Sequence, residues 1–476
     1  MEKDNKLITS RDKDFAKWYT DVVKIAHLAN YSNVKGCVVI EPNGYAIWEK
    51  MQSVLDKKFK ESGHQNIYMP LLIPENLMKK EGELIEGFAP EVAWVTQGGS
   101  KILDERMCIR PTSETLFSDY YHNIVKSYRD LPKKYNQWCN VFRWEKETRP
   151  FLRSREFLWQ EGHTVHESQK EAEEETKLML ETYKDFFENY LAIPVLTGRK
   201  TDKEKFSGAE YSLTIEALMY NGVALQSGTS HYFGQKFSKA YDIKFTNRNN
   251  EAEYAYQTSW GSTTRMIGAL IMVHSDDYGL VLPPKIAPQQ VAIIPIGNND
   301  EVNDISNKIY TDLTNNNITA YIDTTNKTPG FKFADTEVNG IPVRVEVGAR
   351  DLANNVITLV RRDTREKITI AKNANIVEEI TKLLNTIQTD MFNRAKKRRD
   401  ELTFEAHNLD EVKVIMDTQP GFVKAMWCGD EACENKMKEI KGTKSRCIID
   451  DASPIDDKCV VCGKKAKHLV VWGIQY

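Results

Sequence analysis

The segment 141–166, VFRWEKETRPFLRSREFLWQEGHTVH, holds the residues best suited to chemistry. It is typical of two strands around a charged loop, and side chains along a strand alternate between its two faces. Arg143 and Glu145 would then share one face, with Phe157 turned toward the same pocket. Such a pocket suits a nucleotide, because Arg binds phosphate bidentately and an aromatic ring stacks on a base. Taken alone, the pattern fits a charged hairpin on a solvated surface slightly better.

A second group of polar residues follows Arg110, in the sequence RPTSE. Two hydroxyls and the Glu114 carboxylate beside an Arg could receive an ammonium group and orient a small zwitterion. The same residues could start a helix, with Thr112 or Ser113 as its N-cap. Both interpretations can hold together.

Arg265 ends the sequence TSWGSTTR and opens the apolar stretch 266–273. An Arg at the start of a buried helix is costly unless an anion compensates its charge. The anion could be a ligand or the partner in a structural ion pair.

Cysteines gather near the end of the chain. Cys428-x4-Cys433 and Cys459-x2-Cys462 supply four thiolates as two close pairs, which suits tetrahedral Zn²⁺. Four thiolates leave no open position, so the zinc is expected to be structural. Cys447 is left over and is expected to be a buried free cysteine.

Composition bounds the remaining possibilities. The chain has 476 residues, with 65 basic and 68 acidic side chains and a net charge of −3, which argues against coating nucleic acid by bulk charge. No apolar run approaches the ~20 residues that span a bilayer. The N-terminus lacks the apolar region of a secretion signal. We expect a soluble protein of the cytoplasm.

Two kinds of pattern organise the chain. The first part mixes amphipathic helices with apolar strands and predicts an α+β unit with an antiparallel sheet, with helices at 15–28, 45–59 and 168–191 and strands at 65–73, 135–144 and 157–165. After a proline-rich linker, a regular alternation predicts a small α/β domain, with strands at 291–296, 318–322, 343–347 and 356–360 and helices at 301–313 and 331–337. The predicted divisions are 1–285, 286–375, a linking helix at 376–405, and a zinc-binding domain at 406–476.

Together these segments resemble the class II aminoacyl-tRNA synthetases. Pro70, the hairpin with Arg143 and Phe157, and Gly261 with Arg265 are similar to the three motifs of that class. The strings RPTSE, FRWE, RPFLRSREFLWQEGHT, QSGTSHYFGQKF and TSWGSTTR resemble the archaeal and eukaryote-like subgroup of the prolyl-tRNA synthetase family. The third motif has fewer glycines than the class pattern and lacks its acid, a departure that the prolyl subgroup shares.

The resemblance implies a fold and a reaction. The fold is a class II catalytic domain with an antiparallel sheet, an α/β anticodon-binding domain and a small α+β zinc-binding domain. The reaction has proline attack the α-phosphate of ATP, with Mg²⁺ and release of pyrophosphate, before prolyl transfer to tRNA(Pro). The alternatives are a catalytically inactive paralogue that binds tRNA or an amino acid, and an unrelated nucleic-acid-binding zinc protein.

The resemblance also implies roles for individual residues. Arg143 and Arg265 would be catalytic. The ATP site would comprise Arg143, Glu145, Arg153, Ser154, Phe157, Gln226, Thr229, Thr263 and Arg265. The proline site would comprise Thr112, Glu114, Arg143, Trp159, Glu161, His163, His231 and Trp260, although the aromatic and histidine members could equally be core residues. The anticodon contacts would be Lys332, Arg344, Glu346, Arg350 and Asp351, unless these form a solvated sheet edge.

Four further expectations follow from the resemblance. Threonyl enzymes carry a zinc-binding Cys where this chain has Arg110, so zinc-assisted recognition of threonine is not expected. The 94 residues at 164–257 leave no room for the editing domain of some prolyl enzymes. The first motif, around Pro70, implies a homodimer. The terminal Tyr476 is expected to pack back toward the catalytic domain as a functional end of the chain.

Overall fold

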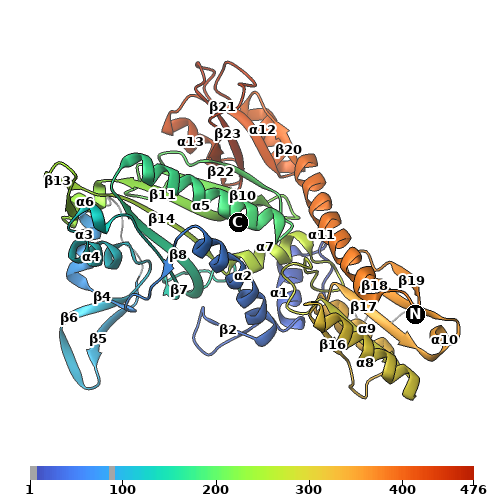
Figure 1. Cartoon of the computed structure of the whole chain (residues 1–476). Helices are drawn as coiled ribbons and strands as arrows, with labels where there is room; N and C mark the ends of the chain where they lie inside the picture. Colours follow the sequence, from blue (N-terminus) through green and yellow to red (C-terminus); the bar gives the residue numbers. More distant parts are fainter. Residues whose placement is uncertain (1–7, 85–91, 298) are drawn as a thin grey trace.

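An eleven-stranded sheet runs through the middle of the protein (Figure 1). The computed structural model describes residues 8–84, 92–297 and 299–476. The strand order is β20-β21-β23-β22-β9-β10-β11-β14-β8-β7-β3. The N-terminal residues 1–7, on which part of the secretion-signal expectation rests, lie outside the described residues. None of the helices in the described ranges combines the length and apolar character needed to cross a membrane.

Seven strands of this sheet come from the first part of the chain. They are β3 (Gln65–Asn66), β7 (Lys133–Phe142), β8 (Glu156–His166), β9 (Val195–Arg199), β10 (Tyr211–Leu218), β11 (Ala224–Gly234) and β14 (Tyr256–Thr263). All neighbours among them are antiparallel except β3 and β7. This confirms the predicted α+β class with an antiparallel sheet.

Four helices pack around one large apolar core beside this sheet. They are α1 (Phe15–Ile25), α2 (Pro42–Glu61), α5 (Gln169–Asn189) and α7 (Arg265–His274). Helix α5 lies along the strands. It begins where the sequence predicts, because the Ser168 side chain accepts a hydrogen bond from the Glu171 backbone amide. The 94-residue stretch between His163 and Thr258 therefore builds α5 and sheet strands of this same unit.

Smaller elements complete the first part. A three-stranded sheet comprises β4 (Leu72–Pro74), β5 (Trp94–Gly98) and β6 (Lys101–Ile109). Around it lie α3 (Glu75–Leu84), α4 (Glu114–Ile124), a 3₁₀ turn (Tyr128–Asp130), α6 (Lys236–Ala240), β12 (Lys244–Thr246) and β13 (Ala252–Tyr254). A hairpin joins β1 (Ala29–Tyr31) to β2 (Val38–Ile40).

The expected continuous strand at 65–73 is wrong. It is two short strands, β3 and β4, with an exposed Pro70 between them. Proline has no amide hydrogen to donate to a neighbouring strand, so the pairing stops on either side of it. The chain changes sheets at this point, because β3 pairs with β7 and β4 with β6.

The second part of the chain forms its own five-stranded sheet, in the order β16-β15-β17-β18-β19. Its elements are β15 (Val291–Ile296), α8 (Asp300–Asn315), β16 (Ala320–Ile322), α9 (Pro329–Val338), β17 (Val343–Gly348), α10 (Ala349–Ala353), β18 (Val356–Arg361) and β19 (Lys367–Ala371). All four predicted strands and both predicted helices are present. Helix α11 (Ile376–Glu401) then runs back toward the central sheet (Figure 1).

The cysteine-bearing part joins the central sheet, which the sequence did not indicate. It comprises β20 (Thr403–Glu405), α12 (Leu409–Thr418), β21 (Phe422–Trp427), α13 (Glu431–Lys438), β22 (Thr443–Ile448) and β23 (His468–Ile474). Strand β22 pairs with β9 through Ile448 and Arg199. The sheet of the first part therefore continues into the C-terminal part instead of stopping at a linker.

A close contact in the core gives a stability prediction. A Cβ added to Gly162 of β8 would lie 2.1 Å from the indole of Trp260, which faces it from β14. We expect Gly162→Ala to lower the free energy of unfolding by about 1–3 kcal/mol, because overpacking displaces a buried ring. Gly98→Ala is the matched control, since its new Cβ would meet only Leu103 Cδ2 at 3.8 Å. Equal urea midpoints for both variants would contradict this packing.

Candidate active site

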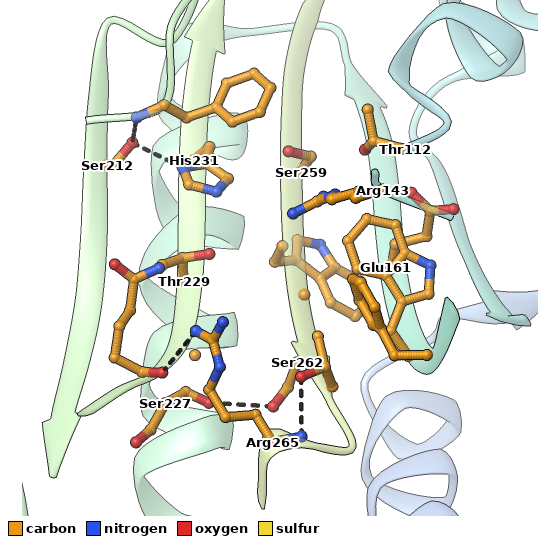
Figure 2. A pocket seen from close by; sticks show the side chains of 18 of the residues that line it. Thr112, Arg143, Glu161, Ser212, Ser227, Thr229, His231, Ser259, Ser262 and Arg265 are labelled. Carbon is orange, nitrogen blue, oxygen red and sulfur yellow. Dashed lines mark hydrogen bonds between the residues drawn. The ribbon is translucent and has the colours of Figure 1, made fainter. Parts of the chain in front are cut away.

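A cavity of about 310 Å³ opens on the central sheet. The strands carry its side chains on the face away from the helix behind them (Figure 2). Every residue expected to bind ATP or proline lines it: Thr112, Glu114, Arg143, Glu145, Arg153, Ser154, Phe157, Trp159, Glu161, His163, Gln226, Thr229, His231, Trp260, Thr263 and Arg265. Residues more than 150 positions apart in the chain thus share one cavity, because β8, β14 and β11 are neighbours in the sheet.

One end of the cavity is rich in arginine. Arg265 opens α7 and is held by backbone carbonyls, with Nε 3.3 Å from the Leu152 oxygen and Nη1 3.5 Å from the Gln226 oxygen. Burial, with the charges of Arg143 and Arg153 added, lowers the pKa of Arg265 to about 10. In the described parts of the chain, Arg265 forms no ion pair with a carboxylate. Among the described residues, the alternative of a structural ion pair for Arg265 is therefore not found.

Arg143 is placed by the loop rather than by a strand. Strand β7 ends at Phe142, and Arg143 continues the pairing through its amide, 2.8 Å from the Arg155 oxygen. Its Nε donates to the Pro111 carbonyl at 3.0 Å. Burial lowers the pKa of Arg143, although nearby carboxylates oppose this. Its side chain faces Phe157, with the guanidinium 5.6 Å from the ring centroid, although Arg143 lies just outside the strand on which the alternation argument placed it.

Aromatic and acidic side chains lie beside these arginines. The rings of Phe157 and Trp159 stand edge to face with centroids 6.1 Å apart. Glu145 lies 3.9 Å from Arg153, too far for a strong ion pair, and the Arg153 side chain is half exposed. An aromatic face, a carboxylate and several guanidinium groups are together suited to a nucleotide with its phosphates.

The other end of the cavity is acidic and buried. The Thr112 hydroxyl donates to Glu114, which opens α4. Burial raises the pKa of Glu114, and His163 opposes that shift. The predicted N-cap interaction is wrong, because Ser113 makes no cap hydrogen bond and instead donates to Glu161 Oε1 at 2.5 Å.

Glu161 is fully engaged by the protein. Its Oε1 also accepts from Gln137 Nε2 at 2.5 Å, and its Oε2 lies 2.9 Å from His163 Nε2. Burial would raise the pKa of Glu161, but the His163 and Ser113 contacts hold it below its usual value. Glu161 therefore fixes His163 and the start of α4, and Glu114 is the carboxyl better placed to receive a ligand cation.

The remaining predicted proline contacts differ in exposure to the cavity. His231 shares a 2.7 Å hydrogen bond with Ser212 (Figure 2), and burial lowers its pKa to about 3, so its ring is neutral. Trp260 lines the cavity, but its indole packs on Phe59, with centroids 4.9 Å apart, and on His64, at 5.0 Å. Its ring is mainly part of the core, which was the alternative interpretation for the aromatic residues.

Several cavity residues were missed from the sequence. They are Lys200, Glu204, Lys205, Phe206 and Ser212, from the end of β9 to the start of β10. Hydrophobic periodicity cannot find the first four, because they lie in a charged connection, RKTDKEKF, and Ser212 is a polar residue near the start of β10. That dense alternation of charge between two strands was the available signal.

The four cysteines meet as predicted. Their sulfur atoms all lie within 4.8 Å of one another, with 3.7 Å from Cys428 to Cys433 and 3.8 Å from Cys428 to Cys462. A zinc tetrahedron with ~2.3 Å bonds needs sulfurs about 3.8 Å apart. Burial and the neighbouring sulfurs raise the pKa of Cys433. The donor set fits zinc, and Cys447 is a separate, buried free cysteine.

The expected anticodon residues divide into two groups. Lys332, Arg344 and Glu346 are less than 9% exposed, so the alternative of a solvated sheet edge is wrong for them. Arg344 pairs with Glu346 at 2.9 Å, and Lys332 Nζ donates to the Asp323 carbonyl at 2.7 Å. Arg350 and Asp351 lie on α10, nearer the surface.

Comparison with known proteins agrees with this architecture. A model of the class II tRNA synthetase core domain (G, H, P, S and T) matches residues 97–274, an anticodon-binding domain model matches 290–383, and a prolyl-tRNA synthetase C-terminal domain model matches 409–476. The chain is 57% identical to a proline--tRNA ligase of Clostridium novyi over 98% of both chains. The chain belongs to the proline--tRNA ligase family.

Other members of the proline--tRNA ligase family match over the same extent. A proline--tRNA ligase of Agathobacter rectalis is 56% identical over the whole of both chains, and a proline--tRNA ligase 2 of Bacillus cereus is 55% identical over 98% of both. The C-terminal match covers all four cysteines and the terminal Tyr476. The family therefore shares both the catalytic core and the cysteine-bearing part with this chain.

The raised pKa of Glu114 leads to a test in solution. Only the ionised carboxylate can pair with an ammonium group, and it is lost as the pH falls through a pKa above the usual 4.5. We expect the KM for proline to rise as the pH is lowered from about 8 to about 5.5, with a smaller change in the KM for ATP. Glu114→Gln should raise the KM for proline about ten- to hundredfold and flatten this profile. A Glu114→Gln enzyme with the wild-type profile would place the titration elsewhere.

Proposed function

We propose that this protein attaches L-proline to tRNA(Pro) in two steps, through prolyl-adenylate and with release of pyrophosphate. The observation that carries the proposal is one buried cavity with opposite polarity at its ends. Buried acids suit the ring ammonium of proline, and Arg143 and Arg265, which pair with no carboxylate among the described residues, suit the phosphates of ATP. The full-length relatives named proline--tRNA ligase support the same reaction.

The geometry gives each group a part in adenylate formation. Glu114 and Thr112 would hold the ring ammonium, so the proline carboxylate points toward Arg143. Arg143 lies between the acidic and the arginine-rich ends and would contact both that carboxylate and the α-phosphate. Negative charge grows on the phosphate oxygens during attack, and fixed guanidinium groups stabilise it without reorganising. Mg²⁺ bound to ATP would add positive charge there.

The other ligand contacts complete the proposal. Phe157 would stack on adenine, with Glu145 near its amine, while Arg153 and Arg265 would hold the distal phosphates. Ser154, Gln226, Thr229 and Thr263 would line the nucleotide. His163 and His231 would enclose the pyrrolidine together with Trp159 and Trp260. The position of all these groups around one cavity supports this assignment.

The other parts of the chain are proposed to serve the tRNA and the fold. We divide the chain into a catalytic unit at 1–285, an anticodon-binding unit at 286–375, a linking helix at 376–405 and a zinc-binding unit at 406–476. Apolar clusters centred on the first, second and last of these parts support the division, although the second cluster includes the linking helix and a smaller cluster joins the first and last parts. Arg350 and Asp351 would meet anticodon bases, while the buried Lys332, Arg344 and Glu346 would shape that surface. Two chains would pair through the region of Pro70.

Proline-dependent exchange of pyrophosphate into ATP tests the activity. The wild-type enzyme should exchange only with proline present, and Arg143→Ala should reduce the rate about 10²- to 10³-fold, because transition-state charge loses a fixed donor. Arg248→Ala is the control, since its side chain is 69% exposed and is not among the residues lining the cavity. No exchange by the wild type would favour the alternative of an inactive protein that binds tRNA or amino acid.

Metal content tests the cysteine cluster. The purified chain should carry about one zinc per molecule, because four thiolates fill one tetrahedral site. Cys459→Ser should lose that zinc and loosen the C-terminal part, whereas Cys447→Ser should keep it, because Cys447 lies outside the cluster. Elemental analysis with circular dichroism reads both effects. Equal zinc in the two variants would contradict the assignment.

A further inference from the structure

Residues 200–206 form one wall of the cavity and are bound to the C-terminal part at several points. Lys200, Glu204, Lys205 and Phe206 line the cavity, and Phe206 lies 5.0 Å from the His231 ring, centroid to centroid. We call residues 200–206 the wall segment. The contacts that hold it join residues more than 200 positions apart, so no local pattern in the sequence indicates them.

The first contact is a buried chain of charges. Lys200 Nζ lies 2.7 Å from Glu216 Oε1, and Arg446 of β22 donates to Glu216 Oε2 at 2.7 and 3.0 Å. All three residues are at most 4% exposed. Burial would raise the pKa of Glu216, but Arg446 and Lys200 lower it. Removal of one member leaves an uncompensated buried charge, so the three are expected to hold one arrangement.

The second contact is a buried hydrogen-bond cluster next to the first. The Thr201 hydroxyl donates to Glu434 Oε1 at 2.8 Å, and the Ser445 hydroxyl donates to the same oxygen. Glu434 is 5% exposed and lies on α13, directly after Cys433 of the cysteine cluster. The cysteine cluster thus fixes helix α13, and Glu434 on that helix binds the wall segment through Thr201.

Two further ion pairs that solvent can reach join the same segments. Lys203 lies 3.4 Å from Glu431 of α13, and the partly buried Lys444 lies 3.3 Å from Glu204. Ion pairs in contact with solvent contribute little, typically ~0–1 kcal/mol. The buried contacts through Arg446 and Glu434 therefore carry the attachment.

We propose that the C-terminal part positions the proline end of the cavity, with Arg446 and Glu434 as its positioning residues. Arg446 acts through Glu216 on Lys200, and Glu434 acts through Thr201. The charge of Lys200 reaches His231, whose pKa it helps to lower, so a shift of the wall segment changes the surroundings of a proposed proline contact. Neither positioning residue is among those lining the cavity. The role in proline binding rests on the proposed function, whereas the attachment itself does not.

The experiment compares Arg446→Met and Glu434→Gln with the control Asp450→Asn. Asp450 pairs with Arg199 at 3.0 Å and links the same two parts of the chain, but it is half exposed. Pyrophosphate exchange should show the KM for proline raised about tenfold in the two test variants, with the KM for ATP within about twofold of wild type. Arg446→Lys should restore part of the effect, since it keeps the buried positive charge. Asp450→Asn should match the wild type.

A second measurement is independent of catalysis. Amide hydrogen exchange of the peptide over 200–206 should be faster in Arg446→Met and Glu434→Gln than in wild type or Asp450→Asn, because the wall segment loses a buried anchor. Glu434→Gln keeps the size of the side chain and so tests the inference even if Arg446→Met does not fold.

The outcomes separate the two proposals. Wild-type values for the proline KM and for exchange over 200–206 in folded variants would overturn the positioning role. A lower kcat together with equal increases in the KM for proline and the KM for ATP, as from general destabilisation, would also overturn it. A wild-type protein without proline-dependent exchange would contradict the proposed function, while faster hydrogen exchange in the variants would still support the attachment.

Discussion

Two cavity arginines that form no ion pair with a carboxylate among the described residues impose the main constraint on this protein. Backbone carbonyls hold the side chains of Arg143 and Arg265. Partial loss of hydration in the cavity lowers the pKa of both. An anion bound between them would offset this cost, and the large apolar core beside the sheet keeps their donors in place.

The opposite end of the cavity solves a second electrostatic problem. Glu114 and Glu161 are close enough to disfavour each other's charge. His163 and the neighbouring donors outweigh burial for Glu161, whereas for Glu114 burial outweighs the opposing effects of His163 and Thr112. The two carboxyls therefore differ in pKa, and Glu114 remains for a ligand. An acidic end suited to a small cation and an arginine-rich end suited to a polyanion match a zwitterionic amino acid next to a nucleoside triphosphate.

The central sheet is also the route by which the ends of the chain meet. Strand β22 extends the catalytic sheet at β9, and the terminal Tyr476 hydrogen-bonds Arg149 in the loop between β7 and β8. The Tyr476 ring packs against the catalytic core, which confirms that the chain end returns to this unit. The C-terminal part, which the sequence predicts to be a separate zinc domain, thus shares one sheet with the strands that carry the cavity.

Local patterns in the sequence determined much of this protein. Periodicity, helix caps and ligand spacing act over a few residues. They predicted helix α5, the β7–β8 hairpin, the four strands and two helices of the second part, and the clustering of the four cysteines. The motifs around Arg143, Glu114 and Arg265 also identified cavity residues before any fold was known. Tertiary structure alone decided which carboxyl stays available, that the Trp260 ring joins the core, and that Arg446 meets Glu216. These outcomes depend on strand neighbours distant in the chain and on the burial that they create, and no local pattern encodes either.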